Sequence, residues 1–328
     1  MEARVREIRR FVLSIGVFIL VPSLPFAQEF PTKPVNILVA SAPGGTQDTS
    51  IRMLANKAEK LLGQPFVITN NGGGAGSVAF GVLAKENPDG YHLVGGASTA
   101  LVRIPHMRSV SYKFEDVIPV MHFVATQTGL VVKGDSPWKT LKEFVEYARK
   151  NPWKVTVAIP GTGTPQHMAM EYVGNREGIQ WTMVPYSGGA PGQTALLGGH
   201  VTAFAGGTSW IPHVKEGSLR LLCTNGEKRM KIFSQVPTLR ELGYDYIDET
   251  VFMIAAPKRT PPAIVKRLDD TFRKAMEDPE FVQAMERMEY DVSYRNHEET
   301  KKYLGEAYHR IGKMVIDLKI PKEEEKKK

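Results

Sequence analysis

The sequence contains one cysteine, Cys223, among 328 residues. A lone cysteine cannot form an internal disulfide, which excludes a disulfide framework, and the apolar stretch LRLLCT around it predicts an inert thiol in a buried strand. A chain without disulfides must be held together by its core. The length and the 42% hydrophobic content allow a large core and about two domains.

The common catalytic and metal-binding motifs are also missing. The sequence has no Gly-x-Ser-x-Gly elbow, no His-Glu-x-x-His and no paired cysteines. His167 and Glu171 lie four residues apart on a predicted helix, but no third metal ligand accompanies them. We therefore predict no metal, no cofactor and no catalytic residue, and interpret His167 as a polar residue that lines a cleft.

The charge is moderate and mixed. The formal net charge is +7, and it falls to +5 when residues 1–27, which hold four arginines and two glutamates, are left out. This surplus mildly favours anionic ligands. Basic residues are scattered among acidic ones and do not alternate with an aromatic platform, so the pattern does not indicate nucleic-acid binding.

Long apolar runs are absent except near the start. Residues 1–27 combine a charged beginning, an apolar run from Phe11 to Val21 and a small residue at Ala27, which is typical of a secretory signal peptide. The run is about half the length needed to span a bilayer, so an uncleaved anchor is the weaker alternative. We therefore predict a signal peptide over residues 1–27 and export to the periplasm.

From Val35 onward, short apolar runs alternate with helical patterns, which predicts an α/β fold with mostly parallel sheets flanked by helices. Helices are predicted from Gly45 to Gly63, from Ser136 and from Thr164. Beyond Pro257 the pattern is helical, so we expect the C-terminal segment to pack back onto the first domain. The predicted strands are VNILVA, PFVITN, YHLVGG, TGLVVK, KVTVAI, WTMVPY, HVTAFAG, LRLLCT and VFMIAAP.

Three glycine-rich segments each join a predicted strand to a predicted helix. They are the first turn (residues 43–48, PGGTQD), the second turn (70–77, NNGGGAGS) and the third turn (159–167, IPGTGTPQH). Exposed N–H groups at a helix N-terminus hold anions. The first turn lacks the lysine of a phosphate loop and the spacing of a dinucleotide site, which favours a carboxylate. Because ligands bind at the carboxyl ends of parallel strands, the three turns are predicted to converge on one cleft.

In order along the chain, these segments resemble the periplasmic solute-binding receptors of tripartite tricarboxylate transporters, the Bug family. The likeness covers essentially the whole chain after residue 27. The matching segments are FPTKPVNILVASAPGGTQD, LGQPFVITNNGGGAGSVAFGVLAKENPDGYHL, GTGTPQH, VPYSGGAP, LLGGHV, VPTLRELGY and AAPKRTPP.

The resemblance implies a two-domain periplasmic-binding-protein fold of type II-like architecture, with the ligand cleft between the domains. Domain 1 would comprise residues 28–126 and 251–328, and domain 2 residues 127–250. The implied ligand is a small carboxylate, either a di- or tricarboxylate or an aromatic acid. The implied partners are the integral-membrane subunits of a transporter, to which a monomeric, non-enzymatic receptor would deliver the ligand.

The resemblance also implies ligand-binding residues, with Asp48 expected to cap the helix or orient water and Tyr186 to offer an aromatic wall or a hydroxyl. Thr202, Val251 and Trp210 depart from the family pattern, and we expect these departures to bear on ligand identity more than on the fold. The implied residues are Ala42, Gly44, Gly45, Thr46, Asp48, Gly74, Ala75, Gly163, Thr164, His167 and Tyr186.

Two alternatives stay open from the sequence. A secreted hydrolase could use the same cleft, with Ser41, Thr164 and His167 as the best available nucleophile and base. A ligand sensor that signals to a kinase would share every feature of a transport receptor.

Overall fold

The structure is a computed structural model that describes residues 30–320 except 187 and 289, together with residue 322. The predicted signal peptide, residues 1–27, lies outside the described residues. Among the residues that are described, no helix is both long and apolar enough to cross a membrane.

A six-stranded sheet is built from both ends of the described chain, in the order β11-β4-β10-β3-β1-β2. β1 pairs in parallel with β2 and β3, whereas β10, β4 and β11 run antiparallel to their neighbours. The strands are β1 (Val35–Val39), β2 (Phe66–Asn70), β3 (His92–Ala97), β4 (Val117–Thr126), β10 (Thr250–Pro257) and β11 (Asp291–Arg295).

Helices from both ends of the chain cover this sheet. α1 packs on α9, and their apolar faces meet the sheet in a core that includes Ile37, Ile51 and Phe272, while α11 packs on β4. The C-terminal helices therefore return to the first sheet, as the sequence predicts. The helices are α1 (Thr46–Leu62), α2 (Ser77–Leu83), α3 (Thr99–Val102), α4 (Ile104–Met107), α9 (Pro262–Met276), α10 (Pro279–Arg287) and α11 (His297–Asp317), with 3-10 turns η1 (Gly73–Gly76) and η2 (Phe114–Asp116).

A five-stranded sheet is built from the middle of the chain, in the order β7-β6-β8-β5-β9. β6 pairs in parallel with β7 and β8, and β5 runs antiparallel to β8 and β9. The elements are β5 (Gly129–Lys133), α5 (Leu141–Lys150), β6 (Thr156–Ile159), α6 (Pro165–Glu177), β7 (Thr182–Pro185), α7 (Gly189–Leu197), β8 (Ala203–Gly206), η3 (Thr208–Trp210), α8 (Ile211–Lys215), β9 (Leu219–Thr224) and η4 (Lys231–Phe233).

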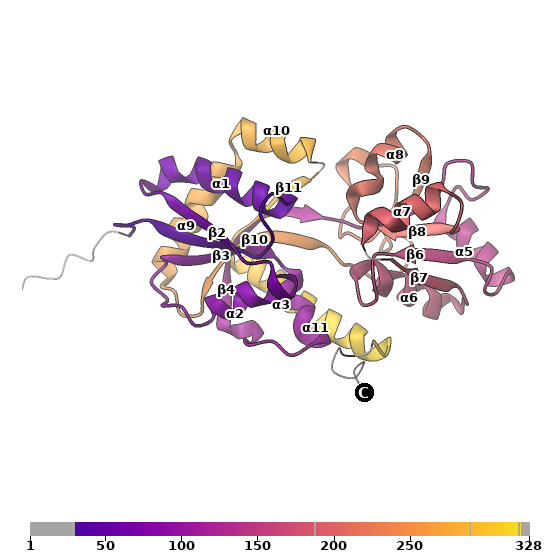
Figure 1. The fold of residues 1–328 in the computed structure, drawn as a ribbon, viewed down its shortest axis with the longest axis horizontal. Coiled ribbons are helices and arrows are strands. Elements are labelled where there is room, and N and C mark those ends of the chain that lie inside the picture. Colours follow the sequence, from indigo (N-terminus) through magenta and orange to yellow (C-terminus); the bar gives the residue numbers. More distant parts are fainter. Residues whose placement is uncertain (1–29, 187, 289, 321, 323–328) are drawn as a thin grey trace, which may run out of the picture.

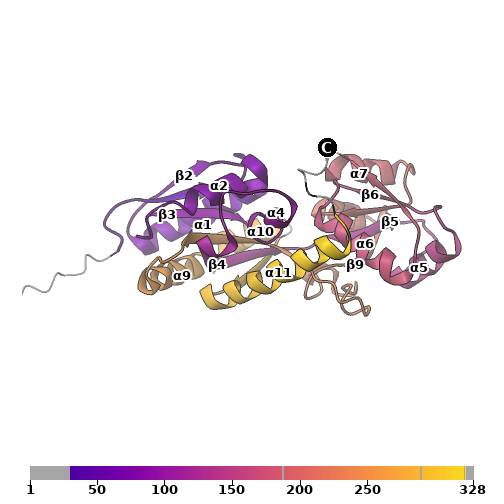
Figure 2. The same cartoon turned by 90° about the horizontal axis from the view of Figure 1, so that it is seen from below.

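Each sheet with its helices forms one lobe, and the two lobes lie side by side along the longest axis of the molecule (Figures 1 and 2). We call the six-stranded half the first lobe and the five-stranded half the second lobe. The chain passes between them after β4 and again before β10. The crossing strands therefore lie inside the first sheet rather than in a separate linker.

The predicted α/β class is confirmed, but the sheets are mixed rather than mostly parallel. The antiparallel pairs involve the strands next to the lobe crossings, because a chain that leaves a lobe on one strand must return on another. Sequence analysis missed β4 and β11. It also placed the start of α5 near Ser136, whereas the helix begins at Leu141 after Thr140, whose side chain forms a capping box with Glu143.

Two of the three residues that depart from the family pattern, Trp210 and Val251, lie in the structural core, and Thr202 is half-buried. Trp210 is fully buried and its indole N–H donates to the Gly206 carbonyl at 3.2 Å. Val251 is also fully buried in β10, and Thr202 bonds to Thr156 beside the second sheet. These contacts give each of the three side chains a structural role, and the expectation that the positions bear on ligand identity stays a prediction. Burial raises the pKa of Cys223 to about 12, which suits the inert thiol predicted.

Candidate functional site

The two sheets turn the ends of their parallel strands toward each other. The end of β1, the end of β3 and the start of β10 lie at one edge of the first sheet, as the pairings Val39 with Gly95 and Ala97 with Phe252 show. In the second sheet, Gly129 at the start of β5 pairs with Gly206 at the end of β8. Since the chain runs from β4 into β5 within a few residues, these edges face each other (Figure 1).

The first turn follows β1 at this edge and leads into α1. Gly44 has a left-handed backbone with φ of +78°, and Gly45 is the N-cap in an extended conformation. Glycine adopts the first of these conformations without strain. The first amides of α1, at Thr46 and Gln47, have no helical carbonyl to bond and stand at the positive end of the helix dipole. The turn can therefore donate hydrogen bonds to an anion.

The side chain of Asp48 stabilises this turn through hydrogen bonds. Its carboxylate accepts the Gly44 amide at 2.8 Å, the Asn70 side-chain amide at 2.7 Å and the Arg52 Nε–H at 2.9 Å. Burial alone raises the pKa of Asp48, but the hydrogen bonds from Asn70, Arg52 and Gly44 outweigh it and hold the pKa below its ordinary value. The carboxylate of Asp48 thus bonds within the protein and holds the Gly44 amide, which precedes the N-cap residue Gly45.

The second turn lies against the first. A methyl group on Gly72 would stand 2.9 Å from the Ala42 amide nitrogen, and one on Gly76 would stand 3.0 Å from the Ala40 carbonyl oxygen. The left-handed run includes Ala75, with φ of +56°, which is uncommon for a residue with a side chain. The structure therefore brings the first and second turns together, with a strained, exposed residue at their junction.

The third turn repeats the design of the first in the other lobe. Gly163 also has φ of +78°, Thr164 is the N-cap of α6, and the Gly163 amide donates to His167 Nδ1 at 3.1 Å. Nδ1 must be unprotonated to accept this bond, so the second ring nitrogen carries the hydrogen and faces Glu171 at 3.5 Å. In both turns, the side chain at the third helical position accepts a hydrogen bond from the backbone amide that precedes the N-cap residue. Asp48 does so for Gly44, and His167 does so for Gly163.

The neighbours of the third turn come from both lobes. The Tyr186 amide donates to the Ile159 carbonyl, which places Tyr186 beside the start of the turn. A methyl group on Gly163 would meet Met107 Cε of the first lobe at 2.0 Å. The lack of a side chain at Gly163 therefore makes room for Met107.

The structure adds Tyr290 to the first turn, a residue that sequence analysis missed. Its hydroxyl donates to Thr46 Oγ1 at 2.6 Å, across 244 positions of the sequence. Asn70 was likewise read only as part of a glycine-rich segment, although its side chain bonds both Asp48 and the Ser41 carbonyl. The double asparagine after β2 was an available signal for Asn70, whereas no local pattern marks Tyr290.

The three residues considered as a nucleophile and base, Ser41, Thr164 and His167, each bond to groups near them in the described chain. Thr164 Oγ1 donates to the Gly161 carbonyl and accepts the His167 backbone amide, while the His167 ring bonds Gly163. The Ser41 hydroxyl points to the neighbouring Ala42 carbonyl. Among the described residues, no group of three or more potential ligands could hold a metal ion.

Comparison with known proteins identifies the class of this chain. The model of the family described as tripartite tricarboxylate transporter family receptor matches residues 50–320. The chain is 35% identical over 302 residues to the UPF0065 protein in the gbd 5' region of Cupriavidus necator, covering 92% of each. It is 31% identical to BugT of Bordetella pertussis, covering 84% of this chain and 87% of the relative. The chain therefore belongs to the tripartite tricarboxylate transporter receptor family.

Solved structures agree with the fold. A solute-binding protein from Polaromonas, crystallised without ligand, superposes with a TM-score of 0.82 at 27% identity and covers 88% of this chain and 99% of that one. A Rhodopseudomonas palustris protein with adipate has a TM-score of 0.70 at 25% identity, covering 89% and 99%. MatC from Rhodopseudomonas palustris with bound malate has a TM-score of 0.66 at 25% identity, covering 87% and 100%. The predicted family and receptor fold are thereby confirmed.

Proposed function

We propose that this protein captures a small carboxylate between its lobes and delivers it to the membrane subunits of a tripartite transporter. One observation carries the proposal: each lobe presents a glycine turn and the N-terminus of a helix at the edge that faces the other lobe. Such ends bind anions through backbone N–H groups. Relatives with adipate and malate bound support a carboxylate as the ligand class.

The proposed contacts divide into donors and supports. Amides at the start of α1 and α6 bind the ligand, while Gly44, Asp48, Gly163 and His167 shape the turns, because their polar groups already bond within the lobes. Ala42, Gly74 and Ala75 form the wall beside the first turn. The remaining proposed contacts are Gly45, Thr46, Thr164 and Tyr186.

Closure of the lobes would give the transporter a signal that the receptor is loaded. A ligand shifts a receptor toward the closed state only if it binds that state better, and donors from two lobes supply this difference. We propose the moving units as residues 28–126 with 251–328 and residues 127–250. The position of the sheet crossings, after β4 and before β10, supports this division.

The proposal places the mature chain in the periplasm as a monomeric, non-enzymatic receptor that binds no nucleic acid. Its relatives are receptors, and the predicted signal peptide provides export. The test for turnover is direct. Incubation with esters and amides of candidate acids should release no more than one equivalent of product, and continued release would instead indicate a hydrolase.

Gly45→Asp tests the anion site without disturbing the fold. Its backbone is extended with φ of −71°, and an added Cβ would stand at an ordinary 3.6 Å from the Ala42 carbonyl oxygen. Aspartate is a favoured N-cap, so its own carboxylate should occupy the amides of α1 and repel a ligand.

We expect calorimetry with adipate, malate, citrate, benzoate and hexanoate to find at least one ligand. Gly45→Asp should weaken its binding at least tenfold, about 1.4 kcal/mol. Gly45→Ala, the matched control, should stay within about threefold, or roughly 0.7 kcal/mol, of the native affinity. Equal affinity of the native and Gly45→Asp proteins would remove the first turn from the site.

A further inference from the structure

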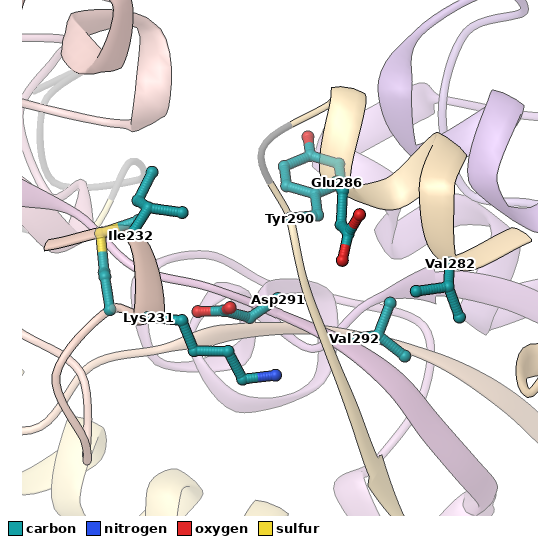
Figure 3. Close-up of a pocket in the computed structure, with 8 residues that line it drawn as sticks. Lys231, Ile232, Val282, Glu286, Tyr290, Asp291 and Val292 are labelled. Carbon is teal, nitrogen blue, oxygen red and sulfur yellow. The ribbon is translucent and has the colours of Figure 1, made fainter. Parts of the chain in front are cut away.

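A pocket of about 270 Å³ lies between the lobes, and Tyr290, whose hydroxyl bonds Thr46, is one of the residues that line it (Figure 3). The second lobe contributes Lys231 and Ile232 from η4, and the first lobe contributes residues of α10 and the start of β11, including Tyr290 and Val292. Its volume is close to the range of small-molecule sites, roughly 300 Å³ and above. Because both lobes line it, its shape depends on how they close.

Tyr290 joins this pocket to the first turn as a rigid wall. Its hydroxyl is fixed by Thr46, and its ring packs edge to face on Phe252, with centroids 5.4 Å apart and planes at 86°. Since Thr46 Oγ1 accepts the Tyr290 hydrogen, the Thr46 hydroxyl hydrogen is available to a carboxylate oxygen. Tyr290 thus bonds the first turn with its hydroxyl and also lines the pocket, so a ligand held at the first turn would reach the pocket along the Tyr290 side chain.

The residues that line the pocket suit an apolar part of the ligand, and they do not suit a second carboxylate. Val292, Val282, Ile232 and the Tyr290 ring provide carbon surface. The charged groups are one ammonium, Lys231, and two carboxylates, Glu286 and Asp291. Burial raises the pKa of Asp291 and the Lys231 charge opposes this rise, so Lys231 already offsets one of the carboxylates. A second carboxylate on the ligand would meet the other one.

We propose that the pocket holds the tail of the ligand, and that the ligand is a carboxylate with one acidic end and an uncharged alkyl or aromatic tail. Adipate and malate, the ligands of the two relatives, have two acidic ends and differ from this class. The inference rests on the proposed function, because the first turn must hold the acidic end.

Calorimetry on the full chain with propionate, hexanoate and adipate tests the ligand class. Each buried methylene should strengthen binding about fourfold, so hexanoate should bind at least tenfold more tightly than propionate. Hexanoate should also bind at least tenfold more tightly than adipate, which has the same length and a second carboxylate. Tighter binding of adipate, or equal binding of propionate and hexanoate, would overturn the inference.

Ile232→Ser tests the place of the tail. Ile232 is 45% exposed, so the change should not affect folding, and we expect hexanoate to bind about fivefold more weakly while propionate is unaffected. Ile316→Ser, on the exposed face of α11, is the matched control and should change neither. An unaltered hexanoate affinity in Ile232→Ser would contradict the assignment.

Lys231→Met tests the alternative that the pocket binds a second carboxylate of the ligand through Lys231. If Lys231 received a distal carboxylate, this variant would lose adipate binding selectively, which would also overturn the inference. With an apolar tail in the pocket, hexanoate affinity should stay within threefold of the native value. Failure of all these acids and of citrate and benzoate to bind would instead contradict the proposed function itself.

Discussion

Single residues with left-handed backbones determine the shape of the first and second turns. Gly44 reaches this conformation at no steric cost, whereas Ala75 adopts it with a side chain, at a cost of about 1–2 kcal/mol. Backbone strain of this kind gathers at binding sites because the surrounding structure holds it. The neighbouring Gly74 and Gly76, also left-handed, are part of that structure.

Ala75→Gly should relieve the strain. We expect the free energy of unfolding to rise by up to about 1 kcal/mol, since the gain is partly offset by the larger entropy of glycine in the unfolded chain. Ala75→Val should lower it by a similar amount, because a β-branched side chain fits this conformation poorly. Urea denaturation of the three proteins measures both changes. A glycine variant less stable than the native protein would show that the strain at Ala75 is smaller than the entropic cost of glycine.

At the scale of elements, β4 carries a buried histidine through the first sheet. Burial, assisted by the positive charge of Arg295, lowers the pKa of His122 to about 3. In the unfolded chain a histidine titrates near pH 6.5, so between these two values the unfolded chain binds a proton that the folded chain does not. The folded state is therefore favoured at the upper end of this window and loses stability as the pH falls.

His122→Gln should make the stability less dependent on pH. For the native protein we expect the His122 contribution to the free energy of unfolding to fall by at most about 1.4 kcal/mol per pH unit below pH 6.5. Urea denaturation at several values between pH 7 and 4.5 measures the slope. Other buried titratable groups affect the native protein and the His122→Gln variant alike. The test is therefore the difference between the two proteins in how steeply the free energy of unfolding changes with pH. Equal slopes would mean that folding does not lower the pKa of His122.

Helices and strands with clear caps or hydrophobic periodicity could be predicted from the sequence. Elements that depend on contacts with residues far away in the sequence could not. α1, α6 and α9 follow from their caps and periodicity, and each glycine turn was recognised as a link from strand to helix. β4 was missed because Pro119 and His122 are unusual in a central strand. The register shift opposite Pro119 shows how the sheet accommodates the proline. The start of α5 was misplaced because the Thr140 capping box was overlooked.

At the scale of the whole molecule, a buried polar network ties the lobes together near the third turn. Arg103 of the first lobe forms an ion pair with Asp248, which accepts a hydrogen bond from Tyr246, and Tyr246 also contacts the Pro165 carbonyl at the start of α6. All three side chains are buried. This network, like the contact of Tyr290 with Thr46, joins residues far apart in sequence. No local pattern could have predicted either.

Arg103→Leu should destabilise the protein strongly. Removing one partner of a buried ion pair leaves Asp248 uncompensated, which costs about 3–5 kcal/mol. The same change at Arg229, whose pair with Glu241 is exposed, should cost less than about 1 kcal/mol. Denaturant unfolding compares the two variants. Similar losses would mean that the buried pair does not hold the lobes.

The segment that follows α11 offers a way to observe ligand capture. Ile320, just beyond α11, is buried with its methyl carbon 3.8 Å from where a Gly163 side chain would begin, so this segment lies beside the binding edge of the second lobe. A dye on the neighbouring Lys319, which is exposed, would sense changes near that edge. The exposed Trp153 of the second lobe is a reference position for the same dye.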